Sequence, residues 1–458
     1  MIAAVGSDTV PAPSAPVPNT QSLELHLNQN NPVCWNNDLS TERQFLWQYF
    51  IFAVKPEFMA IQMGEVTSPL GEFQDPYSTF LPCLALENPA LRNALLCSSA
   101  VSFQHTHGRR DFDGIIRAVA REALQSLQMQ ALDPQGLSDW NLLATILAAT
   151  YLHVQCFAWE KSDGYLHLAT YFAQTLFRRS RRQHAVAKEC LEMTLVTYRW
   201  SMISTLCSLR EPQRALIPKD VCRVIELDGN EISQNFSTAF QDWVSHPLYV
   251  FSPHLVNPLL RIGKLLEQQL LLQAQDASDP TVDGVDLGQS FQDEIADVEK
   301  MLVEAREANM DQVESSTGRG EPKMFLSVNE ATYATSMVLL NARLKGMPYT
   351  APLIREHVQL IVNEISGPAL DSQLSRSCAF YLFIAGCEAV DTQVREAIES
   401  RLKVLTWSVF SNLADLCASL HHVWKIRDQE PGLAWPYWAQ KSKYLHFPRF
   451  VHSTPEIK

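Results

Sequence analysis

Histidine side chains are the first groups in this sequence that could bind a metal ion. Two close pairs occur, His105 with His107 and His421 with His422. In a helix, side chains one or two residues apart point in different directions, so neither pair can hold one ion without further ligands. We therefore expect surface or helix-end histidines, and no metal site, at both pairs.

The ten cysteines could supply thiolate ligands or nucleophiles, but their spacing limits this chemistry. Even the closest two, Cys378 and Cys387, are too far apart for a C-x-x-C metal-binding knuckle or a dense disulfide framework. We expect buried thiols in a reducing compartment, with no zinc and no other cofactor. The cysteines are Cys34, Cys83, Cys97, Cys156, Cys190, Cys207, Cys222, Cys378, Cys387 and Cys417.

Sequence motifs of the common enzyme and nucleotide-binding classes are absent. The chain has no GxxxxGK[ST], no GxGxxG after a strand, no HExxH and no GxSxG. We expect no catalytic residues and a protein that is not an enzyme. Aromatic residues near the C-terminus could enclose a ligand, although packing between helices is the more common role of such a group. They are Trp407, Trp424, Trp435, Trp438, Tyr437 and Tyr444.

One concentrated basic cluster consists of Arg178, Arg179, Arg181 and Arg182. It could serve as a nuclear-import peptide or contact phosphate. The simpler interpretation is that cations at the end of a helix complement the helix dipole and remain in solvent. Both interpretations stay open, and the cluster is the candidate import signal.

The composition indicates a folded globular protein with an acidic surface. With 46% hydrophobic residues in 458, the chain can bury a large core. Its 50 acidic and 37 basic residues give a formal net charge of −13, which repels nucleic acid. The N-terminus lacks a secretory leader pattern, and the most apolar stretch, 142–152, is too short for a bilayer. We expect weak or no direct DNA binding and no membrane association.

Apolar residues recur at three- and four-residue steps from residue 41 onward, which predicts an all-α protein. No repeat of fixed period is present, so we expect one irregular multi-helix stack. Residues 1–33 are rich in proline and predict a disordered arm, followed by one helical domain over 34–458. The clearest helical ranges are 89–103, 112–129, 138–155, 164–178, 187–206, 258–274, 291–310, 328–344, 352–365, 374–386, 391–404 and 412–427. We expect Leu81, Leu84, Leu91, Leu95, Phe383 and Ile384 to be buried.

An acidic segment at about 275–322 carries most of the negative charge. It contains thirteen acidic and three basic residues and reads as loop, acidic helix and loop. It could be a contact surface for a basic partner. A solvated insertion between two helical halves is the simpler interpretation.

Two stretches resemble the fungal-specific transcription factor regulatory domain, the helical region that normally follows a Zn(II)2Cys6 cluster. Residues 75–100, with Leu81, Pro82 and the run from Asn88 to Ala100, are similar to the family consensus "NPYRSLILPLAL-SPALLHAILALSA". Residues 381–389 with Arg395 are similar to its "PLFIAGCEA...R" segment. The middle of the chain departs from the pattern, since residues 164–171 keep only His167 and Leu168 of "W..HL.GA".

The resemblance implies a nuclear regulator of transcription. Only Cys34 lies in the first 80 residues, where the family's zinc cluster would need six cysteines. The module was lost, was never part of this protein, or lies outside these residues. Members without the cluster include regulators of secondary-metabolite genes such as the trichothecene cluster, and this chain looks like that kind. It would act through another DNA-bound transcription factor or the transcription machinery, and it could also pair with a second copy of itself.

A second class of function stays open, because a fold does not determine a function. The same helical fold could bind a small molecule or catalyse a biosynthetic step. Nuclear accumulation of a fluorescent fusion would favour the regulator. A metabolite bound to the purified protein would favour the alternative.

Overall fold

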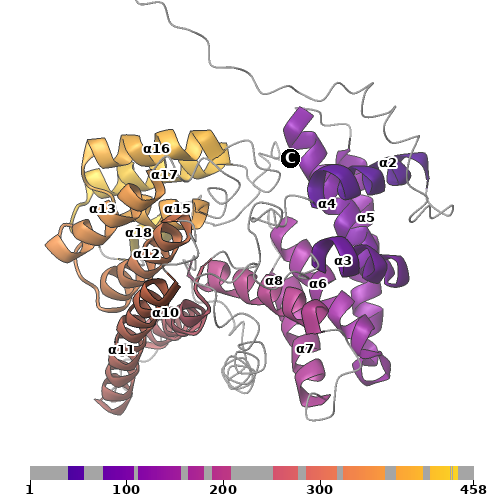
Figure 1. The fold of residues 1–458 in the computed structure, drawn as a ribbon, viewed down its shortest axis with the longest axis horizontal. Coiled ribbons are helices and arrows are strands. Elements are labelled where there is room, and N and C mark those ends of the chain that lie inside the picture. The colour runs from indigo at the N-terminus through magenta and orange to yellow at the C-terminus, as the bar shows by residue number, and fades with distance from the viewer. Residues whose placement is uncertain are drawn as a thin grey trace, which may run out of the picture.

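The computed structural model is all-α across the part of the chain that it describes (Figure 1). The described residues are 40–55, 76–107, 112–155, 163–179, 188–207, 251–276, 285–316, 323–366, 378–405, 413–433, 435 and 437–441. They contain 15 α-helices and no strand. The prediction of an irregular all-α stack is confirmed, and every predicted helical range overlaps an observed helix. The predicted arm, 1–33, lies outside the described residues.

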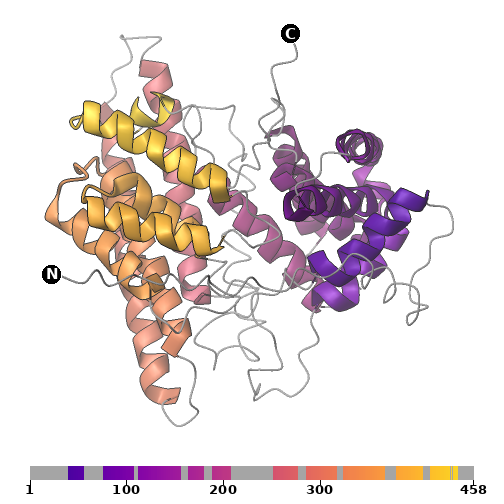
Figure 2. The ribbon, with the colours of Figure 1, turned by 90° about the horizontal axis from the view of Figure 1, so that it is seen from above.

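The helices before residue 208 form an N-terminal group, and those after residue 250 form a C-terminal group (Figures 1 and 2). The first group comprises α2 (Thr41–Tyr49), the π-helix η1 (Phe50–Val54), α3 (Pro76–Glu87), α4 (Pro89–His107), α5 (Asp113–Leu132), the 3-10 helix η3 (Pro134–Gly136), α6 (Asp139–Gln155), α7 (Asp163–Arg179) and α8 (Lys188–Leu206). The second comprises η4 (Pro253–Leu255), α10 (Val256–Asp276), α11 (Val285–Ser316), α12 (Lys323–Val338), the π-helix η5 (Leu339–Leu344), α13 (Pro352–Ser366), α15 (Ala379–Glu388), α16 (Thr392–Leu405), α17 (Leu413–Gln429) and α18 (Tyr437–Lys441).

Side-chain caps determine where several helices begin. The Asn88 side chain accepts a hydrogen bond from the Leu91 amide at 3.1 Å, and Pro89 takes the first helical position of α4. Ser138 accepts from the Asn141 amide at 3.2 Å at the start of α6. Both starts agree with the sequence, because each cap satisfies an amide that has no partner within its own helix.

Helix α8, the last helix of the N-terminal group, lies at the boundary and also contacts the C-terminal group. It packs against α6 and α3 in the N-terminal group and against α10 in the C-terminal group. No residue from 190 to 207 is exposed. A helix that is buried on all sides belongs to the core of a large domain. The hydrophobic core is accordingly one continuous cluster that includes residues from both groups.

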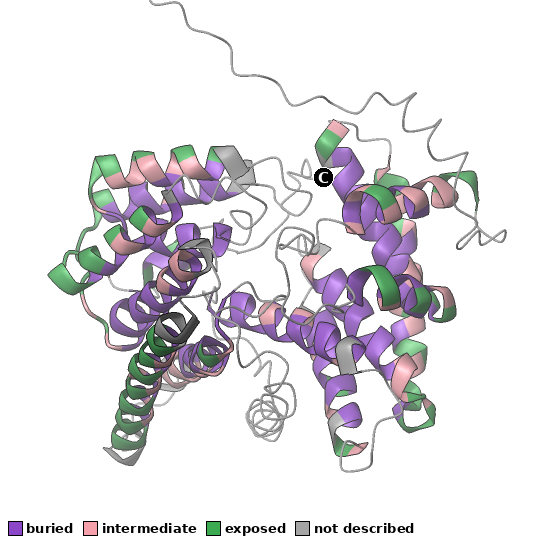
Figure 3. Cartoon of the chain, viewed as in Figure 1, coloured by how far each residue is buried: buried purple, intermediate pink, exposed green. Residues whose placement is uncertain are grey.

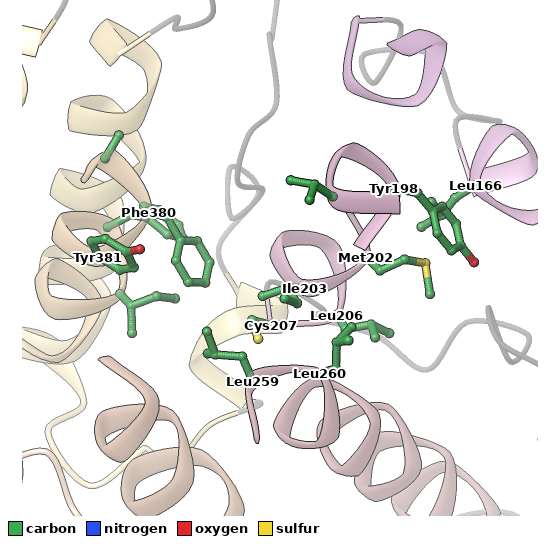
Figure 4. Packing of buried hydrophobic residues seen from close by; sticks show 14 of the residues in the cluster. Leu166, Tyr198, Met202, Ile203, Leu206, Cys207, Leu259, Leu260, Phe380 and Tyr381 are labelled. Atoms are coloured by element: carbon green, nitrogen blue, oxygen red, sulfur yellow. The ribbon is translucent and has the colours of Figure 1, made fainter. Parts of the chain in front are cut away.

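The end of α8 meets the C-terminal group through close contacts that we call the α8 seam: Leu206, Cys207, Gly263 and Arg343. Figure 4 shows Leu206 and Cys207 beside Leu259 and Leu260 of α10. A Cβ atom placed on Gly263 would lie 2.8 Å from the Leu206 Cβ, so only glycine permits this approach of the two helices. The ring of Trp200 adds a tilted contact with Phe251, 5.8 Å between centroids, and an edge contact with Phe380 at 5.4 Å.

The residues expected in the core are buried. Leu81, Leu91, Leu95, Phe383 and Ile384 are fully buried, and Leu84 is 2% exposed. These residues come from α3, α4 and α15, so both family-like stretches contribute to the core.

The helix expected in the acidic segment is α11, which is longer than predicted. Its inner face is buried and contacts α10 and α12, while its outer face is exposed (Figure 3). Arg306 crosses to α12, where it pairs with Glu330 at 2.7 Å. The exposed outer face carries Asp293, Asp297, Glu304, Glu307 and Asp311. One face of the segment is therefore part of the core, and the boundaries of an insertion remain a prediction.

Replacing Gly263 with alanine should destabilise the protein by about 1–3 kcal/mol, because the new methyl group would force α8 and α10 apart. The better helix propensity of alanine would offset only about 1 kcal/mol of this cost. Gly288 in α11 is the matched control, since a Cβ there has nothing within 4 Å. Gly288→Ala should leave the free energy of unfolding unchanged or raise it by up to about 1 kcal/mol. Urea denaturation of both variants measures the difference, and equal effects would contradict the close packing at Gly263.

Candidate functional site

The basic cluster expected as an import signal is only partly described. Arg178 is exposed at the end of α7, and Arg181 and Arg182 lie outside the described residues. Arg179 is held by the turn before α6: it donates to the carbonyl oxygens of Leu137 at 2.6 Å, of Pro134 at 3.1 Å and of Gln135. The interpretation of four solvated cations is therefore wrong for Arg179, which fixes the end of α7 against this turn.

One histidine of each pair makes a described packing or surface contact, and the side chain of His105 lies outside the described residues. The ring of His107 lies 4.3 Å from that of Phe103 between centroids. His421 pairs with Glu399 at 3.0 Å on the surface. Among the described residues, no group of three or more His, Cys, Asp or Glu side chains could hold a metal ion.

The described cysteines are free thiols, and most of them are buried. Burial raises the pKa of Cys207, Cys378 and Cys387 to about 12. These three are therefore protonated at neutral pH and are poor nucleophiles. Cys34, Cys156 and Cys222 lie outside the described residues.

A surface groove of about 540 Å³ lies beside α4 and α5. Arg43 from α2 makes two hydrogen bonds to Glu122, at 2.8 and 2.6 Å, along its wall. These bonds lower the pKa of the Glu122 carboxyl. Most of the other lining residues are polar, and Pro89 and Met129 are apolar: Pro89, Arg92, Asn93, Gln125, Ser126, Met129 and Gln130. The groove presents no pair of groups arranged for acid–base catalysis.

Buried charges gather at one place in the C-terminal group. Arg427 of α17 pairs with Glu388 of α15 at 2.7 Å, and the two side chains are only 4% and 2% exposed. Arg427 also donates to the Cys387 carbonyl at 2.7 Å. Its guanidinium carbon lies 3.9 Å from the centroid of the Tyr349 ring and 4.9 Å from that of Trp438. The charge of the Glu388 carboxylate is therefore balanced by an arginine from another helix, α17.

A second buried arginine, Arg343, lies against the same aromatic group. It comes from the π-helix η5, is 1% exposed, and donates to the Cys207 carbonyl at the end of α8. Its guanidinium carbon is 5.5 Å from the Trp435 ring centroid and 6.0 Å from that of Trp438. We call Arg343, Glu388, Arg427 and the rings of Tyr349, Trp435 and Trp438 the arginine cluster.

The segment around Glu388 also holds three helices together. The Gly386 carbonyl accepts a hydrogen bond from the Trp424 indole of α17 at 2.8 Å. Arg395 of α16 donates to the Ala389 carbonyl at 3.0 Å and binds Asp428 through two bonds of 2.7 Å. Gly386, Glu388 and Arg395 therefore have structural roles at the junction of α15, α16 and α17.

The two arginines of the cluster were not among the residues predicted from the sequence. Arg343 lies in the apolar run Leu339-Leu340-Asn341-Ala342-Arg343-Leu344, and a lone charge in such a run was the available signal. Trp435 and Trp438, expected to pack helices, do so and also cover both arginines. Trp407 and Tyr444 lie outside the described residues, and Tyr437 is exposed.

Comparison with known families identifies the class of this domain. Residues 62–446 match the family described as the fungal specific transcription factor domain. The chain belongs to this family. The match includes both the Leu81 region and the Glu388 segment of this transcription factor domain. Membership supports a role in the regulation of transcription. No curated protein and no solved structure matches the chain, and no described helix is long and apolar enough to cross a membrane.

Removing the carboxylate of the buried pair should be costly. Glu388→Gln leaves the Arg427 guanidinium buried without a charge partner, so we expect a loss of about 3–5 kcal/mol of stability. The control is Asp391→Asn, which breaks the exposed Arg355–Asp391 pair and should cost less than about 1 kcal/mol. Denaturant unfolding of both variants compares them. A Glu388→Gln loss as small as the control's would show that Arg427 does not need this carboxylate.

Proposed function

We propose that the protein is a nuclear regulator of a fungal pathway, a secondary-metabolite gene cluster, that reaches promoters through a DNA-bound partner. The observation that carries the proposal is the family match over residues 62–446. The partner is another transcription factor or the transcription machinery.

The case for a partner rests on charge and on cysteine spacing. The formal net charge of −13 opposes the binding of phosphate, so bulk electrostatics supplies no affinity for DNA. The ten cysteines lack the close spacing that a binuclear zinc cluster needs. The exposed acidic face of α11 offers a surface of the sign that would suit a basic partner.

Deleting the gene tests the regulatory role directly. We expect the transcripts of a group of neighbouring biosynthetic genes to change together, measured by RNA sequencing under conditions that induce the pathway. The control is the same strain complemented with the wild-type gene, which should restore the transcripts. Unchanged transcripts together with an accumulated biosynthetic intermediate would instead identify an enzyme on the same fold.

Nuclear import can be tested without disturbing the end of α7. A triple variant that changes Arg178, Arg181 and Arg182 to alanine keeps Arg179 and its bonds to the turn before α6. We expect this variant to move from the nucleus to the cytoplasm, as followed with a fluorescent fusion.

The matched control is Arg179→Ala. It removes hydrogen bonds from a charged donor and should cost about 1.5–3 kcal/mol of stability while leaving the protein nuclear. Nuclear retention of the triple variant would show that import uses another segment.

A further inference from the structure

The guanidinium of Arg343 has an unpaired edge deep in the protein. Its Nη1 donates to the Cys207 carbonyl, but its Nε and Nη2 are buried and have no hydrogen-bond partner among the described residues. These two nitrogens lie along one edge of the planar guanidinium group and present two parallel N–H groups. That edge is the one with which arginine binds both oxygens of a carboxylate.

Further polar atoms of the arginine cluster are also unpaired within the described residues. Arg427 Nε and Trp435 Nε1 are buried donors without a partner. The one unpaired acceptor of the cluster is Glu388 Oε1. Donors therefore outnumber acceptors, and the cluster contains two guanidinium cations but a single carboxylate, which pairs with Arg427. The cluster has an excess of one positive charge.

The two arginines meet around one aromatic ring. Arg343 and Arg427 both contact the ring of Trp438, and Arg343 also lies against Trp435. Glu388 pairs with Arg427 at 2.7 Å, which joins the carboxylate to the same group.

Burial makes the imbalance expensive. An unpaired buried donor loses its hydrogen bonds to water, and the loss is larger for a charged group. A buried water could accept from the donors but could not balance the charge. A carboxylate does both. The π-helical turn that carries Arg343 also points to a binding site, because such turns frequently occur at functional positions.

We propose that the arginine cluster is a binding site for a small carboxylate, held by the Nε and Nη2 edge of Arg343 beside Trp435 and Trp438. The Arg427 charge adds attraction, and Glu388 restricts the site to one added negative charge. The proposal does not depend on a transcriptional role.

The position of the site gives binding a structural consequence. A carboxylate on one edge of the guanidinium fixes the plane from which Nη1 reaches the Cys207 carbonyl. Binding would therefore strengthen the α8 seam, where the N-terminal and C-terminal groups meet.

The test uses the full chain with sodium acetate as the probe and acetamide as its neutral isostere. Thermal unfolding is followed while acetate replaces chloride at constant ionic strength. We expect the unfolding midpoint to rise and saturate with acetate, and to stay unchanged with acetamide. Acetate should also slow amide hydrogen exchange at 203–207 in the α8 seam. Equal responses to acetate, acetamide and chloride would overturn the proposal and indicate that water solvates the donors.

Variants of the cluster test whether the acetate-dependent rise in the unfolding midpoint comes from binding at Arg343. Arg343→Lys keeps the charge and a donor for Cys207 but lacks the planar edge, so acetate should bind about tenfold more weakly or worse. Trp435→Phe keeps a ring and removes one unpaired donor, so acetate should bind more weakly than to the wild type.

The control for these variants is Arg355→Lys at an exposed pair, which should respond to acetate as the wild type does. If Arg343→Lys does not fold, Trp435→Phe and the acetate–acetamide comparison still decide. An unaltered acetate response in both cluster variants would place the binding elsewhere and overturn the proposal.

Discussion

The burial of α8, which has no exposed residue from 190 to 206, is the constraint on which the rest of the structure depends. A helix without an exposed face must be covered on every side, and neither group of helices covers it alone. α6 and α3 cover one side, and α10 covers another. The hydrophobic gain from α8 is therefore complete only when both groups are in place. The glycine at 263 follows from this requirement, because α10 must approach the α8 backbone closely at Leu206.

The arginine cluster adds polar contacts that also hold α8 to the C-terminal group. The last carbonyl groups of a helix have no partner within it, and Arg343 supplies a donor to the Cys207 carbonyl just after α8. Glu388 and Arg427 then fix α15 against α17. A buried ion pair adds little net stability compared with apolar packing, but it discriminates against other arrangements because each charge requires its partner. The glutamate of the family-like segment is best understood as a determinant of helix arrangement.

The helices were predictable because their signals are local. Apolar periodicity and caps such as Asn88 and Ser138 depend on residues within one or two turns. The arginine contacts were not predictable, since Arg343 reaches a carbonyl 136 residues away and Arg427 a carboxylate 39 residues away. Arg179 shows the same limit: its position at a helix end indicated a solvated cation, but a turn 42 residues earlier supplies its partners. Apolar periodicity in the sequence predicts that a residue is buried. It does not predict which distant residue will be its hydrogen-bond or charge partner.

Because helices of both groups cover α8, the chain cannot be truncated between the two groups without exposing apolar side chains. A fragment that ended after α8, from a premature stop codon or a truncated expression clone, would expose the side chains that α10 normally covers, among them Ile203 and Leu206. A newly exposed apolar strip of this kind attracts chaperones and proteases and adheres to unrelated proteins. An interaction screen that used such a half-length fragment would detect many nonspecific binders. Mapping of partners therefore requires the intact domain.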